Sequence, residues 1–202
     1  FQSALVELGE RPYRAKQIWH WLYYQGARTF DEMTTLPKSL RTRLSGSCNI
    51  DRPTVNRMQQ SEDGARKWLV RFADEREVEC VHIPEKDRGA LCISSQVGCT
   101  LTCRFCHTGT QKLVRNLDAG EIVNQVLIAR DTIGEWPSPK DGRMISNIVM
   151  MGMGEPLYNF DNVARALRII MDGEGISLSR RRITLSTAGV IPLIERCGRE
   201  LG

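Results

Sequence analysis

The chain has 202 residues, 41% of them hydrophobic, with a formal net charge of +4, so it can bury a sizeable core as one large domain or as one domain with an appendage. It contains no run of about 18 apolar residues, and its first residues lack the zones of a signal peptide, so neither a membrane protein nor a secreted one is expected. The seven cysteines are odd in number and unevenly spaced, which excludes a simple disulfide framework and predicts a reducing, cytoplasmic setting.

The first 48 residues predict a small helical domain, a candidate for RNA binding. One amphipathic helix is predicted from the spacing of its apolar residues Ile18, Trp19, Leu22 and Tyr23. This helix would end at Gly26. A second short helix, interrupted at Pro37, is expected within residues 29–44. Residues 1–46 have a net charge of +3, which is compatible with a polyanionic partner but is also typical of a solvated basic surface.

Aromatic residues gather on the first of these helices, at Trp19, Trp21, Tyr23 and Tyr24. Such a stripe could stack on RNA bases. Aromatic residues at helical spacing are more often part of a core, and we expect that arrangement here.

Residues 49–88 predict a β-hairpin or meander between the helical domain and the rest of the chain. The segments "KWLVRF" and "EVECVHIP" alternate apolar and polar residues, and "ADERE" joins them. We expect Pro84 to end the second strand, because proline provides no backbone N–H for strand pairing.

Residues 89–202 alternate between strand and helix patterns. Strands are expected at "ALCISSQVGC", "MISNIVMMG" and "RRITLSTAG", and each is followed by an amphipathic segment. This order predicts an α/β fold with three parallel βα units. Three units cannot close an eight-stranded barrel, so we expect a partial barrel and a chain that is truncated at its C-terminal end.

Three cysteines, Cys99, Cys103 and Cys106, follow the first of these strands with the spacing C-x3-C-x2-C. Closely spaced thiolates are ligands for zinc or for an iron–sulfur cluster. Zinc would need a fourth ligand, for which the neighbouring His107 is the candidate. An iron–sulfur cluster with three protein ligands would keep one iron open for a substrate or cofactor. Three ordinary buried cysteines are the third alternative.

The cysteine motif, with Phe105 directly before its last cysteine, resembles the signature of the radical S-adenosylmethionine (SAM) superfamily. The resemblance implies a partial (β/α) barrel, a [4Fe–4S] cluster on the three cysteines, and SAM bound to the open iron. In that superfamily, reduction cleaves SAM to a 5′-deoxyadenosyl radical. The cofactor carries this chemistry, and the protein supplies position and exclusion of water.

Further segments resemble the dual-specificity RNA adenine methyltransferases of the RlmN type: "RPYRAKQIWHWLY", "CISSQVGC", "MMGMGEPLYNFDNV" and "SRRRITLSTAG". This resemblance implies methylation of carbon 2 of adenosine in 23S ribosomal RNA and in transfer RNA. Two alternatives stay open. One is the related carbon 8 methyltransferase of the antibiotic-resistance type. The other is a non-catalytic RNA-binding module stabilised by zinc.

The same resemblance implies roles for individual residues. Gly154, Glu155 and Ser186 match cofactor contacts, Glu79 matches a proton acceptor, and Cys92 matches a second reactive cysteine. Phe105 is expected to pack beside the adenine of SAM.

The family's methyl-carrying cysteine has no match in this chain, since Cys197 lies in a different setting, and we expect the chain alone to be inactive. The expected partners are ribosomal RNA, transfer RNA and an electron donor of the flavodoxin or ferredoxin type. We expect a monomer and no membrane partner.

Overall fold

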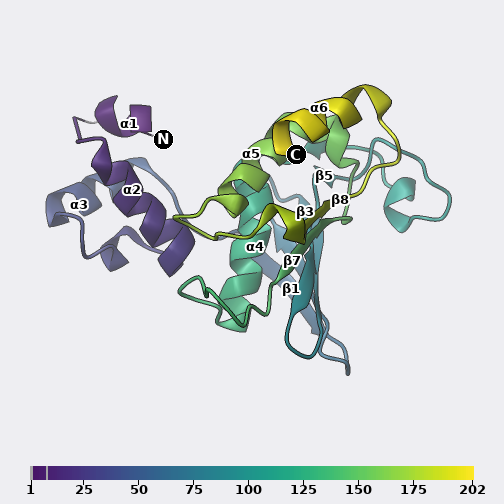
Figure 1. Cartoon of the computed structure of the whole chain (residues 1–202), viewed down its shortest axis with the longest axis horizontal. Helices are drawn as coiled ribbons and strands as arrows, with labels where there is room; N and C mark the ends of the chain where they lie inside the picture. Colours follow the sequence, from purple (N-terminus) through teal and green to yellow (C-terminus); the bar gives the residue numbers. More distant parts are fainter. Residues whose placement is uncertain (1, 8) are drawn as a thin grey trace.

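The computed structural model describes residues 2–7 and 9–202, and it begins with a cluster of short helices (Figure 1). These are α1 (Gln2–Glu7), α2 (Tyr13–His20), the π-helical turn η1 (Trp21–Gln25), the 3-10 turn η2 (Phe30–Glu32) and α3 (Lys38–Ser47). They enclose a small core of their own that includes Ile18, Met33 and Leu40. The helix that was predicted to end at Gly26 is formed by α2 and η1, and Gly26 follows it in a left-handed conformation. The short helix predicted with an interruption at Pro37 is formed as η2 before this proline and α3 after it.

A six-stranded sheet forms the centre of the molecule, in the order β1-β2-β3-β4-β7-β8. Its strands are β1 (Thr54–Gln60), β2 (Arg66–Arg71), β3 (Glu77–Pro84), β4 (Gly89–Cys92), β7 (Asn147–Met150) and β8 (Ile183–Leu185). The first four strands pair antiparallel, whereas β4, β7 and β8 are parallel. The hairpin predicted from "KWLVRF" and "EVECVHIP" is therefore confirmed, and β1 extends it by one further strand.

Three helices cover one face of the sheet and leave the other face open (Figure 1). They are α4 (Ala119–Ile133), α5 (Phe160–Met171) and α6 (Ile191–Leu201), and each follows one of the parallel strands. The main core lies between the sheet and these helices and includes Trp68, Leu91 and Ile148. The α/β fold with three βα units is thus confirmed, and we call β4, β7, β8 and their three helices the partial barrel, or barrel for short. Cys197 on α6 packs in a smaller cluster with Leu157 and Phe160.

The remaining elements are short and lie in the connections. They are β5 (Gln96–Val97), η3 (His107–Thr110), β6 (Arg115–Asn116), η4 (Pro156–Asn159) and η5 (Arg180–Arg182). Within the described residues, no helix is long and apolar enough to cross a membrane.

The helical cluster contacts the barrel through specific polar bonds. Arg52 forms an ion pair with Asp131 on α4 (3.1 Å) and donates to the carbonyl of Gly26 (3.3 Å). Trp19 Nε1 donates to Asp172 after α5 (3.0 Å). Tyr23 packs against both the helical and the barrel cores. The aromatic stripe is therefore mostly part of the core and of this junction, as expected.

Gly26 is a position where only glycine fits. Its φ is +78°, and a Cβ added to it would overlap the ring of Trp136. We expect Gly26→Ala to lower the free energy of unfolding by about 2–4 kcal/mol, since left-handed strain and overpacking add. Thermal and urea unfolding would measure this change.

The matched control for Gly26→Ala is Gly134→Ala, at the end of α4. Gly134 has a similar φ of +76°, but no atom lies within 4 Å of its added Cβ. The free energy of unfolding of this variant should fall by only about 1–2 kcal/mol, which is the cost of the backbone strain alone. Equal losses in the two variants would show that the contact with Trp136 does not restrict position 26.

Candidate functional site

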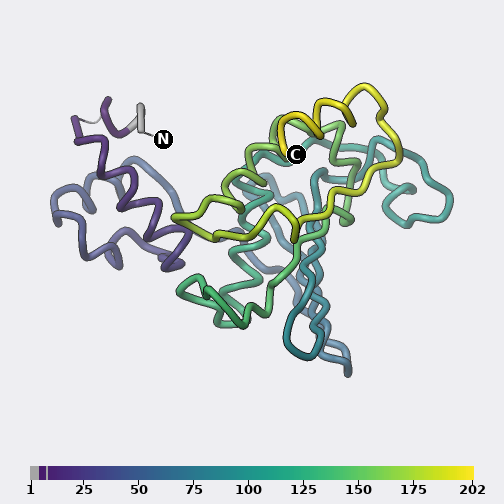
Figure 2. The backbone as a smooth tube through the Cα atoms, in the orientation of Figure 1, coloured from purple at the N-terminus to yellow at the C-terminus, as the bar shows by residue number. Residues whose placement is uncertain are grey.

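The three-cysteine segment is a projecting loop that is tied at its base. After β4, the short strand β5 pairs with β6, and Cys99 forms an isolated bridge with Lys112. The intervening residues extend away from the barrel, at the end of the molecule opposite the helical cluster (Figure 2). Gly98, with φ +75°, lies against the carbonyl of Lys112, where an added Cβ would overlap that oxygen. The base of the loop therefore requires glycine at this position.

Backbone hydrogen bonds shape the loop around its cysteines. Cys106 N–H donates to the carbonyl of Cys103 (3.1 Å), and Gly109 N–H donates to the carbonyl of Cys106 (3.0 Å). The N–H of Leu101 points at Sγ of Cys99, 3.4 Å away. All three cysteines are free and half-buried. Three thiols on one loop, one of them already accepting from a backbone N–H, are a donor set that fits an iron–sulfur cluster.

A single cavity of about 190 Å³ brings most of the predicted site residues together. It lies between the cysteine loop and the carboxyl ends of β7 and β8. The residues that were predicted from sequence and that line it are Cys99, Cys103, Phe105, Cys106, Gly154, Glu155 and Ser186. In parallel α/β folds, ligands bind at the carboxyl ends of the strands, so this is the expected place for a cofactor.

Glu155 joins the ends of two strands. Its side chain is only 3% exposed. Oε1 accepts from the N–H of Leu157 (3.0 Å), and Oε2 accepts from the N–H of Ala188 after β8 (2.7 Å). A carboxylate oxygen has more than one acceptor site, so Glu155 can still accept bonds from an ammonium group in the cavity.

Gln96 links parts of the candidate site although it does not line the cavity, and no sequence motif indicated this role. Its Oε1 accepts from the N–H of Glu155 (2.9 Å), while Nε2 donates to Asn116 (2.7 Å) and to Thr100 in the cysteine loop (3.1 Å). Gly154, with φ +96°, packs so closely that an added Cβ would lie 2.5 Å from Cβ of Gln96. Gln96 therefore connects the cysteine loop to the Gly154-Glu155 turn.

Two more buried side-chain amides bind the backbone between β4 and β5. Gln125 of α4 accepts from the N–H of Ser94 (2.8 Å) and donates to its carbonyl (2.9 Å). Asn159 donates to the carbonyls of Ser95 (2.8 Å) and Leu117 (2.7 Å). A signal for Gln125 is present in the sequence, since it is a polar residue on the apolar face of a predicted helix.

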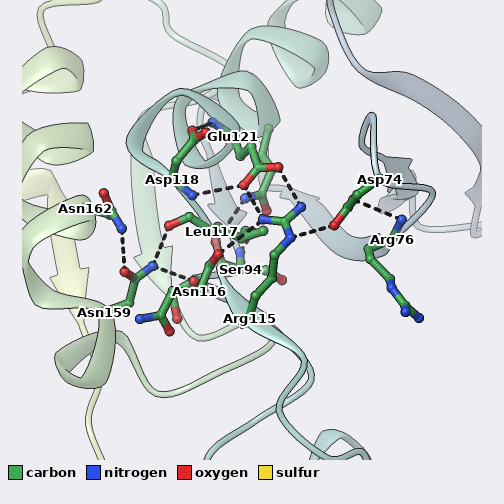
Figure 3. A network of polar contacts seen from close by, with 12 residues as sticks. Asp74, Arg76, Ser94, Arg115, Asn116, Leu117, Asp118, Glu121, Asn159 and Asn162 are labelled. Atoms are coloured by element: carbon green, nitrogen blue, oxygen red, sulfur yellow. Dashed lines mark hydrogen bonds and ion pairs between the residues drawn. The ribbon is translucent and has the colours of Figure 1, made fainter.

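Arg115 braces the base of the cysteine loop (Figure 3). Its guanidinium donates to both carboxylate oxygens of Glu121 on α4 (2.7 and 2.8 Å) and to Asp74 in the β2–β3 turn (2.6 Å). The hydrogen bond from Arg115 lowers the pKa of Asp74 to about 2. Because the pKa of Asp74 in the folded chain lies below its ordinary value, the bond stabilises the fold fully at pH values above that ordinary pKa. This stabilisation is lost as the pH falls towards 2 and Asp74 becomes protonated.

We expect Arg115→Met to lower the free energy of unfolding by about 1–2 kcal/mol, because charge-assisted hydrogen bonds are lost while the aliphatic stem is kept. The variant should also lose less stability between about pH 4 and pH 2 than the wild type does. Unfolding curves at several pH values measure both effects. Arg76→Met in the same turn is the control, since its exposed side chain should be dispensable. An unchanged acid profile in Arg115→Met would contradict the assignment.

Glu79 and Cys92 do not line the cavity; they lie on the open face of the sheet. Glu79 is exposed and pairs with Lys67 (3.0 Å), while its N–H contacts the sulfur of Met153 (3.4 Å) beside the Gly154 turn. Cys92 lies on the same face as Glu79, because its pairing partner in β3 is Val81, which is two residues after Glu79. Burial raises the pKa of the Cys92 thiol, so the protonated form is favoured.

Phe105 and His107 both lie at the surface of the loop. The ring of Phe105 is 94% exposed although it borders the cavity, and His107 is exposed and does not line it. Among residues 2–7 and 9–202, no three His, Cys, Asp or Glu side chains lie close enough together to hold a single metal ion.

Two known families match different parts of the chain. Residues 1–50 match the family described as the ribosomal RNA large subunit methyltransferase N-terminal domain, and residues 93–199 match the radical SAM superfamily. The second match covers more than half of the chain and includes the cysteine loop and the cavity.

Two relatives called dual-specificity RNA methyltransferase RlmN match nearly the whole chain. The Rhodospirillum rubrum protein is 66% identical over 201 residues, which cover 99% of this chain and 47% of that protein. The Gluconobacter oxydans protein is 61% identical over 204 residues, which cover 99% of this chain and 50% of that protein. The chain thus spans about half the length of these relatives.

A crystal structure of a radical SAM methyltransferase from Sphaerobacter thermophilus has the same fold. It superposes with a TM-score of 0.89 at 44% sequence identity, over 98% of this chain and 57% of the other.

Proposed function

The chain belongs to the radical SAM superfamily, and from this premise we propose that it forms part of an RNA methyltransferase that acts on carbon 2 of adenosine in 23S ribosomal RNA and transfer RNA. The observation that carries the proposal is the shared cavity, which places the three thiols beside the Gly154-Glu155 turn and Ser186. The names of the relatives support the choice of RNA as substrate.

In this proposal, Cys99, Cys103 and Cys106 hold a [4Fe–4S] cluster, and Gly154, Glu155 and Ser186 bind SAM. The bound cofactors would supply a carbon-centred radical, which suits the electron-poor carbon 2 of adenine. The chain's own residues position the cofactor: Glu155 accepts from its ammonium group, and Gly154 lets the backbone approach. Phe105 becomes available to pack on the adenine of SAM, since its ring borders the cavity and is exposed.

Glu79 and Cys92 are proposed to act on the substrate base rather than on SAM. Both are on the open face of the sheet, and the N–H of Glu79 lies 3.4 Å from the sulfur of Met153, which directly precedes Gly154. A base on this face would have Glu79 as proton acceptor and Cys92 as the second reactive cysteine. Glu79 is now exposed and paired with Lys67, so a bound RNA would have to replace that pair and exclude water for the carboxylate to accept a proton.

The proposed division of the chain follows its cores. Residues 1–48 form the helical, RNA-binding domain, residues 49–88 the β-hairpin extension, and residues 89–202 the first half of the barrel. The buried residues of the helical core all come from the first of these segments, and Ile50 at the start of the second packs against them. We further propose a cytoplasmic monomer that is reduced by a flavodoxin- or ferredoxin-type donor.

Nucleoside mass spectrometry tests the function. A full-length protein that contains this chain, with cluster, SAM and reductant, is incubated with unmodified ribosomal and transfer RNA. We expect 2-methyladenosine in both RNAs. Methyl groups found only on carbon 8 would favour the antibiotic-resistance type, and no methylation by a cluster-loaded protein would overturn the proposal.

A further inference from the structure

A second cavity, of about 600 Å³, lies at the opposite end of the parallel strands from the cysteine loop. Its walls are the loop between α4 and β7, the loop between α5 and β8, and the turn before β4, with Tyr24 of the helical cluster at one side. These three connections all lead into the amino ends of strands. We call this space the basic cavity, and none of the proposed site residues lines it.

The basic cavity has an excess of positive charge. Arg88, Lys140, Arg143 and Arg182 line it, against two carboxylates, Asp87 and Asp141, which gives a net charge of +2. This is half of the net charge of the whole chain. Within residues 2–7 and 9–202, neither Lys140, Arg143 nor Arg182 forms an ion pair, whereas Arg88 pairs with Glu85. Three cations that face one space without a paired carboxylate favour an anionic ligand.

Arg143 is fixed in place before any ligand binds. It is half-buried, and Nη1 donates to the carbonyl of Ile176 (2.8 Å) in the facing loop. Burial lowers its pKa, and the charge of Glu135 opposes this effect. An anion in the cavity would compensate for the lost hydration of this guanidinium.

The neutral groups of the cavity also fit phosphate oxygens. Ser177 and Ser179 carry hydroxyl groups on the loop that faces Lys140, and Ser177 has a φ of +57°, which is strained for a residue with a side chain. Gly142 and Gly173 leave room for a ligand to approach the backbone. Hydroxyl groups, arginines and backbone N–H groups are the usual partners of nucleic-acid phosphates.

We propose that the basic cavity binds the phosphate backbone of the RNA substrate, away from the base that reacts. This inference rests on the proposed function for the identity of the ligand. The helical cluster contributes Tyr24 to the cavity wall, and the N–H of Ser138 donates to the carbonyl of Tyr24 (2.7 Å), so the cavity is continuous with the proposed RNA-binding domain. An RNA held there would be anchored at the amino ends of the strands while its reactive loop reaches their carboxyl ends.

The double variant Lys140→Gln/Arg182→Gln tests this, in a full-length protein that contains this chain. The matched control is Arg165→Gln/Arg199→Gln, which removes two arginines from the exposed surfaces of α5 and α6. Fluorescence anisotropy with labelled transfer RNA gives the dissociation constant at several salt concentrations. We expect the cavity variant to bind about 5- to 20-fold more weakly, with a salt slope smaller by about 1–2, because two phosphate contacts are lost. The control should match the wild type.

Three outcomes decide between the possibilities. A weaker affinity with a smaller salt slope in the cavity variant alone supports the proposal, and kcat for methylation at saturating RNA should then be unchanged while KM rises. Equal affinities and slopes in wild type and cavity variant overturn it, even if the wild type methylates RNA normally. If inorganic phosphate or ATP binds the wild type but not the variant, while RNA affinity is unchanged, the ligand is a free phosphate compound and the RNA assignment is wrong.

The test does not depend on the methylation reaction. RNA binding is measured without reductant, so a protein that binds RNA through the basic cavity but fails to methylate it would contradict only the proposed function. A protein that methylates RNA with the cavity variant unaffected would contradict only the inference.

Discussion

Cys103→Ala should abolish the brown colour of anaerobically prepared protein. The wild-type chain is expected to carry about four irons and to absorb at about 400 nm, as thiolate-bound clusters do. With one of three thiols missing, the variant should retain about a tenth of the iron or less. The reason is geometric, because within the shared cavity the remaining two cysteines cannot replace the ligand that Cys103 provides from the middle of the loop.

Cys48→Ala is the matched control for this loss. Cys48 is free and exposed, and it follows α3 in the helical cluster, far along the chain from the loop. The control should keep its iron and colour. Circular dichroism should show that both variants are folded, because the cysteine loop lies outside the main core. A colourless wild-type protein that is folded and loaded with zinc would contradict the cluster and favour the structural zinc alternative.

Glu155→Gln should weaken SAM binding and destabilise the fold together. The carboxylate accepts one backbone N–H on each oxygen, whereas the amide nitrogen of Gln can only donate. One buried N–H, of either Leu157 or Ala188, would therefore lose its acceptor, at about 1–3 kcal/mol of unfolding free energy. The loss of negative charge should weaken SAM binding by about tenfold or more, measured by calorimetry on cluster-loaded protein.

Glu195→Gln on the exposed surface of α6 is the control for Glu155→Gln. Its carboxylate is 3.6 Å from Arg199 and largely solvated, so neither stability nor SAM affinity should change measurably. A Glu155→Gln variant that is destabilised but binds SAM normally would restrict Glu155 to joining β7 and β8. A Glu155→Gln variant that is as stable as the wild type but binds SAM weakly would show that the N–H groups of Leu157 and Ala188 find other acceptors.

The two ends of the parallel strands have different proposed roles in this chain. The carboxyl ends carry the cavity of the three thiols and Glu155, and the amino ends carry the basic cavity. The helical cluster is joined to the barrel by the ion pair of Arg52 with Asp131 and by the hydrogen bond from Trp19 to Asp172. A joint made of specific bonds would hold an RNA-binding domain at a constant distance from the reacting cofactor.

Local sequence was sufficient for most of the helices and strands. The strand and helix patterns after residue 89 depend on the periodicity of apolar residues, which each segment carries by itself. The cysteine spacing likewise lies within eight consecutive residues. This is why the three βα units could be predicted from the patterns of single segments, whereas Gly154 and Glu155 were named only through the resemblance to a known family, and their roles stay a prediction.

Only the tertiary structure revealed the residues that hold these parts together. Gln96 joins Thr100 to Glu155 across 55 residues of chain, and Arg115 joins the β2–β3 turn to α4. Such bonds depend on which strand ends become neighbours, and a single polar residue shows no pattern for that. The basic cavity was missed for the same reason, because its cations come from separate connections that only the parallel order of β4, β7 and β8 brings to one edge. The sequence by itself determined the chemistry available to each segment, and the fold decided which of these groups act on the same space.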